Sequence, residues 1–175
     1  MLCGPQNCGK TTFCDRYFKE IPGCTIISID EAIFEELEAA TLNDTRASIR
    51  MKAWSKIKQK MWNAHNEGKT IVYDSTTINF ERRVSEILEF ARIFQKIYLI
   101  VIDIDENELK RHGEKITPVK ALRYGLCHPN QEMCIEKSKE LKNQIKENLI
   151  KCGADEVFLI TSLDLERGVE VHLTN

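Results

Sequence analysis

The segment GPQNCGKT, from Gly4 to Thr11, constrains the architecture of this chain more than any other. It fits the pattern GxxxxGK[ST], in which glycine residues allow backbone N–H groups to wrap around phosphate oxygens. A stretch with helical periodicity follows, and the N-terminus of a helix favours anions. We therefore expect a strand, a phosphate-binding loop and a helix in succession. The residues expected to hold the phosphates of a nucleotide are Gly4, Pro5, Gln6, Asn7, Cys8, Gly9, Lys10, Thr11 and Thr12.

Two side chains of this loop have distinct roles in such a motif. Lys10 provides a positive charge for the β- and γ-phosphates, and the Thr11 hydroxyl can be a ligand of Mg²⁺. The motif thus predicts ATP and Mg²⁺ as cofactors. A loop of this kind normally follows a buried strand, yet only Met1, Leu2 and Cys3 precede the first glycine. We expect the first strand to be very short and to pair weakly.

Strand-like and helix-like segments alternate along the rest of the chain. Apolar runs predict strands at residues 24–29, 70–74, 96–104 and 156–161. Helical periodicity predicts helices at residues 10–20, 30–40, 44–66, 81–94 and 131–151. The runs IVYD and IYLIVIDI are almost continuously apolar, as in a parallel sheet covered by helices on both faces. The pattern predicts a three-layer α/β fold with a mainly parallel sheet of about four or five strands.

Length and composition exclude several classes of protein. With 175 residues, and roughly 150 residues per domain, we expect one domain spanning residues 1–175. Hydrophobic residues make up 42% and charged residues 30% of the chain, which argues against disorder. No apolar run reaches the roughly 18 residues that a membrane span needs, and no signal peptide is visible, so we expect no membrane partner. The net charge of −2 excludes binding of nucleic acid through overall positive charge, but it leaves room for local basic patches.

The cysteines, seven in number, indicate a reducing compartment. Their number is odd, no pair has CxxC spacing, and histidines at metal-ligand spacing are missing. We therefore expect reduced thiols in a cytoplasmic protein. Most of them should be small buried hydrophobic residues, but Cys8 lies inside the phosphate-binding loop. We expect thiol reagents to modify Cys8 and inhibit the protein, and ATP to protect it.

Two aspartates follow predicted strands. Asp30 follows the run TIISI and Asp74 ends the run IVYD, so both should lie at the carboxyl edge of the sheet, where α/β domains bind ligands. Phosphoryl transfer needs a base for the acceptor hydroxyl and acidic groups near Mg²⁺. Asp30 suits the first role, and Asp74 suits the outer shell of the metal. Capping of the following helix is an alternative role for Asp30.

This constellation resembles the P-loop kinases related to phage 5′-hydroxyl polynucleotide kinases. In that family an Asp at a strand end follows the loop Lys at a separation similar to that between Lys10 and Asp30. The segment DSTTINFERR, from Asp74 to Arg83, is similar to a D-x-T-N-like segment and Arg-bearing helix of the family. The runs IYLIVIDI and ELKRHGEKITP resemble its next strand and basic lid. The resemblance covers roughly residues 1–160 and implies a kinase with Asp30 as the general base.

Several positions depart from that family. An Arg that follows the base by a few residues, and resembles a clamp for a substrate phosphate, is replaced here by Ile33. The resemblance implies that Lys115, with Arg111 upstream, stabilises the transferred phosphoryl group, although Lys lacks the bidentate fork of Arg. Arg82 and Arg83 match an Arg pair of the family and are candidates for substrate binding. We expect at least one of this pair to be a structural ion-pair partner.

The segment from Arg46 to Lys60 contains basic but no acidic residues. At about 100° per residue, nearly all of these cations fall within a roughly 160° arc of a helix. This face could contact nucleic-acid phosphates, with Arg46 and Arg50 as candidates, or could be a solvated surface. Trp54 and Trp62 could stack on bases, but their positions on the apolar side favour core packing.

The interpretation that we favour is an ATP- and Mg²⁺-dependent kinase that phosphorylates the 5′-hydroxyl end of a polynucleotide. A polar, helical segment at about residues 110–128 would close over ATP as a lid. A kinase of small metabolites or nucleotides is the first alternative, favoured by Ile33 and by the acidic residues after Asp30. A nucleotide-dependent switch or ATPase that binds a partner without phosphorylating it is the second.

Overall fold

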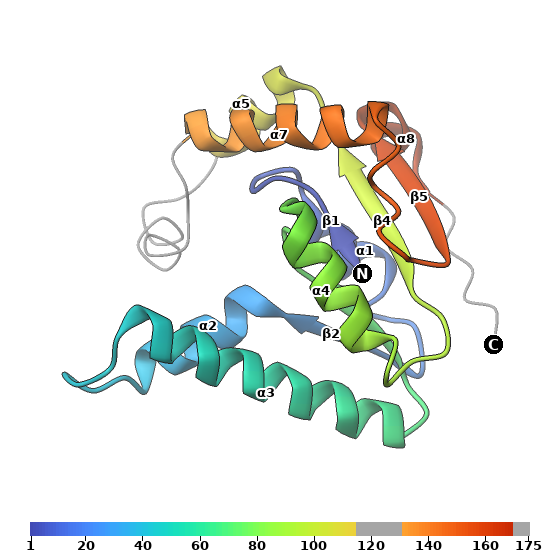
Figure 1. The fold of residues 1–175 in the computed structure, drawn as a ribbon. Coiled ribbons are helices and arrows are strands. Elements are labelled where there is room, and N and C mark those ends of the chain that lie inside the picture. Colours follow the sequence, from blue (N-terminus) through green and yellow to red (C-terminus); the bar gives the residue numbers. More distant parts are fainter. Residues whose placement is uncertain (115–130, 170–175) are drawn as a thin grey trace.

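The computed structural model describes residues 1–114 and 131–169 of the 175-residue chain. Within them, strands and helices alternate, as Figure 1 shows. The strands are β1 (Leu2–Cys3), β2 (Cys24–Ser28), β3 (Thr70–Asp74), β4 (Tyr98–Asp103) and β5 (Glu156–Thr161). The helices of these residues are α1 (Lys10–Tyr17), α2 (Ile29–Glu38), α3 (Arg46–Asn66), α4 (Phe80–Phe90), α5 (Glu106–Glu114), α7 (Gln131–Lys146) and α8 (Ser162–Arg167).

All the described strand pairs are parallel, and they form two sheets. One sheet has three strands in the order β1-β4-β5, and the other has two strands, β2 and β3. Hydrogen bonds connect the two sheets next to β1: Gly4 N donates to Thr76 O at 3.1 Å, and Thr77 Oγ1 donates to Leu2 O at 2.8 Å. β1 therefore lies between β3 and β4. The predicted α/β fold with parallel strands is confirmed, but the described strands form two sheets where one sheet of about four or five strands was predicted.

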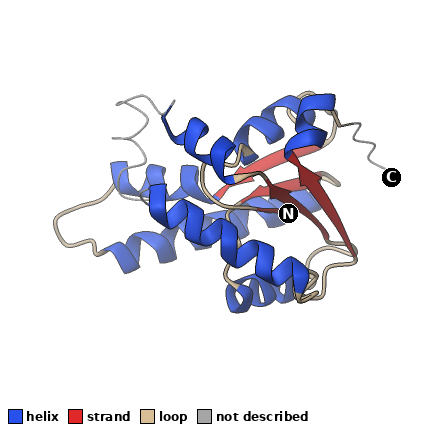
Figure 2. Ribbon diagram, turned by 90° about the horizontal axis from the view of Figure 1, so that it is seen from above, coloured by secondary structure: helices blue, strands red, loops and turns tan. Residues whose placement is uncertain are grey.

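Hydrophobic cores lie on both faces of the strands, as a three-layer arrangement requires. On one face, Ile57 of α3 and Ile87 of α4 share a core with Val101 of β4. On the other face, Phe13 of α1 and Leu109 of α5 belong to a second core. Figure 2 shows the helices on either side of the strands. This arrangement brings the carboxyl ends of the parallel strands, and the loops that follow them, to one edge.

β1 is short but well anchored. Leu2 and Cys3 are 0% exposed and pair with Ile100 and Val101 of β4. The carbonyl of Met1 extends this pairing by accepting a hydrogen bond from Ile100 N at 2.9 Å. The predicted shortness of this strand is confirmed. The predicted weak pairing is wrong, because β4 flanks the strand on one side and the chain after β3 flanks it on the other.

The junction between β2 and α2 differs from the prediction. β2 ends at Ser28, whose Oγ accepts a hydrogen bond from Glu31 N at 3.4 Å, so Ser28 is the N-cap of α2. Asp30 lies in the first turn of the helix instead, and the alternative that it caps α2 is wrong. A carboxylate in the first turn interacts favourably with the positive end of the helix dipole.

Several helices end earlier than their periodicity predicts: α1 ends at Tyr17, α4 at Phe90 and α7 at Lys146. Apolar residues beyond these ends still pack against the core, as Phe94 does, so the hydrophobic pattern outlasts the helix. None of the helices in the described part of the chain is long and apolar enough to cross a membrane. α5 occupies the first residues of the predicted lid, and residues 115–130 lie outside the described residues.

Candidate active site

The phosphate-binding loop joins β1 to α1 and is tightly packed. A Cβ atom at Gly4 would lie 2.7 Å from Cys8 Sγ and 2.8 Å from Ile102 O, so only glycine fits at this position. Asn7 and Gly9 have φ angles of 66° and 92°, left-handed conformations that turn the chain into α1. Successive turns of this kind form the concave backbone surfaces that bind anions in proteins.

Lys10 is the first residue of α1 and is only 8% exposed. Its Nζ donates hydrogen bonds to Gly4 O at 2.9 Å and to Pro5 O at 2.7 Å, and it lies 3.7 Å from Cys8 Sγ. The loop therefore holds a positive charge against its own backbone, at the place where the motif predicts phosphates.

Thr11 and Asp74, the two residues predicted to serve the metal, lie next to each other. The Thr11 hydroxyl donates a hydrogen bond to Asp74 Oδ2 at 2.7 Å, which connects α1 to the end of β3. Asp74 is only 5% exposed, so the backbone of β3 and the loop fix the position of its carboxylate.

A magnesium ion fits this pair of residues. Mg²⁺ binds oxygen ligands and usually keeps several waters, with one or two carboxylates and the substrate phosphates completing its shell. The Thr11 hydroxyl and the Asp74 carboxylate are oxygen donors that already lie together. Within the described residues, no group of three or more His, Cys, Asp or Glu is arranged to hold a metal ion, so a dedicated protein cage is absent from that part of the chain.

A cavity of about 380 Å³ opens beside the phosphate-binding loop. Gln6 of the loop and Asp30 of α2 both line it, together with side chains of α3 and α4. Trp54 and Ile33 provide apolar parts of its wall, and Ile33 occupies the position where the resembling family has an Arg. Asp30 is therefore brought to a ligand-sized cavity next to the predicted phosphate site, as its assignment as a base requires.

Arg82 lines the same cavity and is held by a partner on its own helix. Its Nε donates to Glu86 Oε1 at 2.7 Å, an i,i+4 pair on α4. The side chain of Glu86 is only 5% exposed, and burial raises the pKa of its carboxyl group, an effect that the Arg82 guanidinium partly offsets. The pair keeps the Arg82 guanidinium at the wall of the cavity.

Arg83, the adjacent residue, is completely buried and has a structural role. Its Nη1 donates to Thr77 O at 2.9 Å and Ile78 O at 3.0 Å, and its Nη2 donates to Gln144 Oε1 of α7 at 2.5 Å. These bonds anchor the chain after β3 to α4 and α7. The prediction that Arg83 binds substrate is wrong, because successive residues on a helix point about 100° apart. Its other partners include the Cys152 thiol, at 3.2 Å from Nε. The expectation that at least one residue of this Arg pair is an ion-pair partner is confirmed by Arg82, which pairs with Glu86.

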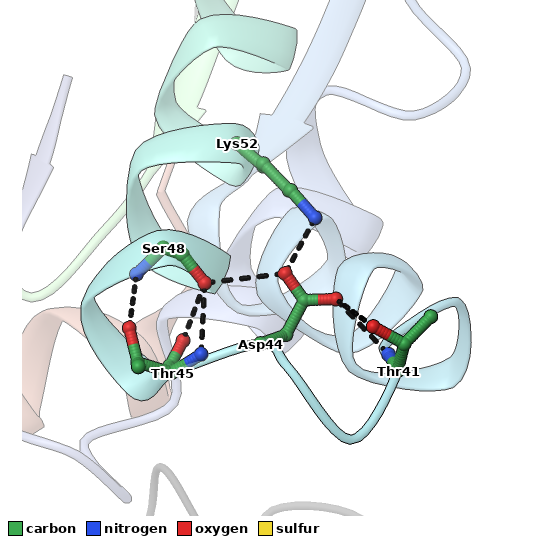
Figure 3. A network of polar contacts seen from close by, with 5 residues as sticks. All are labelled: Thr41, Asp44, Thr45, Ser48 and Lys52. Carbon is green, nitrogen blue, oxygen red and sulfur yellow. Dashed lines mark hydrogen bonds and ion pairs between the residues drawn. The ribbon is translucent and has the colours of Figure 1, made fainter.

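Acidic side chains neutralise much of the basic face of α3. Lys52 Nζ contacts Asp44 Oδ1 at 2.6 Å, within the network of polar contacts around the start of α3 that Figure 3 shows. Lys56 and Lys60 pair with Glu35 of α2 at 2.6 Å and 3.4 Å. The side chains remain exposed, but their charges are balanced locally. These lysines therefore fit a solvated, ion-paired surface better than a site for nucleic acid.

The two arginines of this face differ from each other. Both Arg46 and Arg50 are exposed, and neither forms an ion pair with the described residues. Arg50 lines the cavity that contains Asp30, whereas Arg46 does not. Of the predicted candidates on α3, Arg50 is therefore the one that the fold brings to the site.

α5 contributes a residue to which sequence reasoning gives no role. His112 Nδ1 lies 3.0 Å from Asn7 O, a hydrogen bond in which the ring donates from Nδ1. No sequence motif signals this contact, because it joins residues that are far apart in the chain. Arg111 on the same helix pairs with Glu108 at 3.2 Å and is exposed, and Lys115 lies outside the described residues.

Cys8 is fully buried beneath the loop. Burial raises the pKa of its thiol, which lowers the fraction of reactive thiolate. Both features argue against rapid modification of Cys8, and inhibition by thiol reagents with protection by ATP stays a prediction. All cysteines of the described residues are free thiols.

The two tryptophans have different surroundings. Trp54 packs against the rings of Tyr73 and Phe90, with centroid distances of 6.3 Å and 6.0 Å, and also lines the cavity. Trp62 is 48% exposed and packs against His65. Core packing is thus confirmed for Trp54 and is wrong for Trp62.

Together, the parallel strands, the glycine-dependent loop and the adjacent Lys10, Thr11 and Asp74 define a P-loop nucleotide-binding domain. Residues 1–115 match the family model described as AAA domain, and the chain belongs to this family, whose P-loop members include kinase-like proteins. A search of curated proteins finds no match to the chain.

Proposed function

We propose that the chain is an ATP-dependent kinase that transfers the γ-phosphate of ATP to a hydroxyl group bound beside Asp30. One observation carries the proposal: Asp30 lines a cavity that also includes Gln6 of the phosphate-binding loop. Transfer to an external hydroxyl needs a carboxylate next to the phosphates and a space large enough for the acceptor. A nucleotide-dependent switch has no need of either.

In this mechanism the loop N–H groups and the Lys10 ammonium group bind the β- and γ-phosphates. Thr11 and Asp74 would hold Mg²⁺, which supplies positive charge to the phosphate oxygens. Asp30 accepts a hydrogen bond from the acceptor hydroxyl and orients its oxygen toward the γ-phosphorus. That oxygen forms a bond to the γ-phosphorus while the bond to the β,γ-bridging oxygen breaks. ADP keeps the electron pair, and the hydroxyl proton passes to Asp30 and then to solvent.

In this proposal, Arg111 and Lys115 stabilise the negative charge on the transferred phosphoryl group. Arg111 projects from α5, the helix whose His112 contacts the phosphate-binding loop. Its pair with Glu108 leaves the Arg111 side chain 59% exposed, and exposed ion pairs exchange partners readily.

The acceptor that we propose is the 5′-hydroxyl end of a polynucleotide. The segment from Asp74 to Arg83 and the position of Asp30 support it through their resemblance to polynucleotide kinases. The cavity, at about 380 Å³, is at the small end of ligand sites and suits one terminal unit of a strand. A kinase of small hydroxyl compounds is the second candidate, because acidic residues balance the lysines of α3 and leave little positive surface for a strand.

The test supplies ATP labelled at the γ-phosphate with a 5′-hydroxyl oligonucleotide and, separately, with a panel of hydroxyl metabolites and nucleosides. Label should appear on the oligonucleotide, and Asp30→Asn should lower the rate by about a hundredfold to ten-thousandfold while nucleotide still binds. Glu31→Gln, a neighbouring exposed carboxylate, is the matched control and should be as active as the wild type. Release of label only as inorganic phosphate, or full activity of Asp30→Asn, would overturn the proposal.

A further inference from the structure

The cavity beside Asp30 contains two guanidinium groups from different helices. Arg50 comes from α3 and Arg82 from α4, and both line the cavity. Arg50 forms no ion pair with the described residues. Arg82 contacts the Glu86 carboxylate through Nε and lies beside Tyr73, but its side chain is still 47% exposed and can meet an anion at the cavity wall.

The other cations near this region are balanced by acidic groups. Lys58 contacts Glu89 of the cavity wall at 3.2 Å. Elsewhere on α3, Asp44 in the segment between α2 and α3 balances Lys52, and acidic residues of α2 balance Lys56 and Lys60. The positive charge that a ligand would meet is therefore local, and it is concentrated at the two guanidinium groups of the cavity.

We propose that the acceptor is recognised through a single phosphate group that Arg50 and Arg82 bind together, with Glu86 as the positioning residue for Arg82. Guanidinium groups match phosphate oxygens with paired hydrogen bonds, and two of them can hold one phosphate from two sides. This inference rests on the proposed function, which assigns the hydroxyl of the same acceptor to Asp30. Because Ile33 stands where the resembling family has an Arg, α2 provides no cation that could bind the phosphate. Arg50 of α3 and Arg82 of α4 provide the positive charge instead.

Recognition of one phosphate has a consequence for chain length. If the α3 surface held a strand, each added phosphate would strengthen binding and steepen the dependence on salt, by a slope of about −0.7 per phosphate for single strands. If two arginines bind a single phosphate, further phosphates on the ligand add no binding free energy. The phosphate itself could belong to a terminal nucleotide or to a phosphorylated metabolite with a free hydroxyl, and the same two arginines would bind either.

The experiment measures equilibrium binding by calorimetry, which does not depend on transfer. The probes are thymidine, thymidine 3′-monophosphate, 5′-hydroxyl oligothymidylates with two and eight nucleotides, and ribose 5-phosphate. Thymidine 3′-monophosphate should bind at least about tenfold more tightly than thymidine, because a charged hydrogen-bonded contact is added. The octanucleotide should bind within about threefold of the mononucleotide, since the α3 lysines are already paired. Ribose 5-phosphate separates the two sources of the phosphate: binding as tight as the mononucleotide indicates a metabolite, and weaker binding indicates a nucleotide.

Variants identify the residues that carry this preference. Arg50→Gln and Arg82→Gln should each reduce the preference for thymidine 3′-monophosphate over thymidine by about tenfold, without changing the affinity for thymidine. Glu86→Gln should reduce the same ratio by a smaller factor, and Glu86→Asp should restore part of it. A purely structural role of Glu86 would weaken both probes equally and leave the ratio unchanged. Arg92→Gln, an exposed arginine beyond α4, is the control and should keep the wild-type ratio.

Three results would overturn the inference. One is equal binding of thymidine and thymidine 3′-monophosphate, and another is an unchanged ratio in both arginine variants of the cavity. The third is binding that tightens steadily with oligonucleotide length and weakens in Arg46→Gln, which would move the phosphate site onto the exposed face of α3. Because these experiments measure binding, they test the phosphate site separately from the transfer reaction of the proposed function. That failure would appear as phosphate-dependent binding at Arg50 and Arg82 with no transfer of label to any acceptor.

Discussion

The phosphate-binding loop and the wall formed by α2 and α3 both contribute to the cavity, but their polar groups are held in place in different ways. In the loop, buried contacts fix the key groups: Gly4 has no room for a Cβ atom, and Lys10 is bonded to loop carbonyls. In the wall, α2 and α3 share a buried core, but their polar faces are joined by exposed ion pairs such as Lys56 to Glu35. The difference indicates that the donor side of the site tolerates little change, whereas the acceptor side can change its partners.

The largest expected effect follows from Lys10→Ala. This substitution removes a buried cation from the loop, and transition-state charge in phosphoryl transfer depends on such groups. We expect the transfer rate to fall by about a thousandfold or more, with weakened nucleotide binding, as measured by initial rates of label transfer and by nucleotide titration. Lys19→Ala, an exposed lysine after α1, is the control. A rate within tenfold of the wild type would contradict the contrast between the loop and the wall.

The loop could be predicted from the sequence because its chemistry is local. One short segment determines the backbone shape of the loop through the spacing of Gly4, Gly9, Lys10 and Thr11. Asp74 ends a predicted parallel strand, which places it at the carboxyl edge of the sheet. The order of the strands and longer helices was predictable for the same reason, since each has its own periodicity, whereas the periodicity did not predict the short helices α5 and α8.

The wall could not be predicted, because its chemistry depends on pairing between distant elements. The lysines of α3 look free in the sequence, and their acidic partners come from α2 and the segment before α3. Arg82 and Arg83 are adjacent and chemically identical, yet one lines the cavity and the other is buried. Which of them faces the core depends on the rotation of α4, to which α7 contributes through Gln144. His112 is a further example, because its partner in the loop lies far away in the sequence.

The next largest effect should come from Arg83→Met, which should lower the free energy of unfolding. The substitution keeps much of the apolar volume but removes the guanidinium donor of the Thr77 carbonyl and of the Gln144 side-chain oxygen. The Ile78 carbonyl keeps its hydrogen bond from Gln144 Nε2. An unsatisfied buried polar group costs about 1–3 kcal/mol, so we expect a loss of about 3 kcal/mol in the free energy of unfolding, measured by urea denaturation. Arg92→Met at an exposed position should change it by less than about 0.5 kcal/mol. Equal stability of the two variants would mean that Arg83 does not join the loop side to α7.

The thiols provide a test of burial within the loop. Cys8 is 0% exposed with a raised pKa, whereas Cys152, after α7, is partly exposed. Iodoacetamide at pH 8 should therefore modify Cys152 at least about tenfold faster than Cys8, as mapped by mass spectrometry of the native protein. In denaturant the two sites should react at similar rates. Rapid modification of Cys8 that ATP prevents would show instead that the loop opens easily in solution.

The smallest effect is expected on the wall, from Thr45→Ala. Thr45 is the N-cap of α3: its hydroxyl accepts a hydrogen bond from Ser48 N at 3.1 Å, and Ser48 Oγ accepts one from Thr45 N at 2.9 Å. Loss of such a cap costs about 1 kcal/mol, which urea denaturation can resolve. The long apolar face of α3, with Ile57 in the core, should keep Arg50 at the cavity, so acceptor affinity should change by less than about twofold. A large loss of affinity with this small loss of stability would mean that the start of α3 positions Arg50, and that the wall is as sensitive to change as the loop.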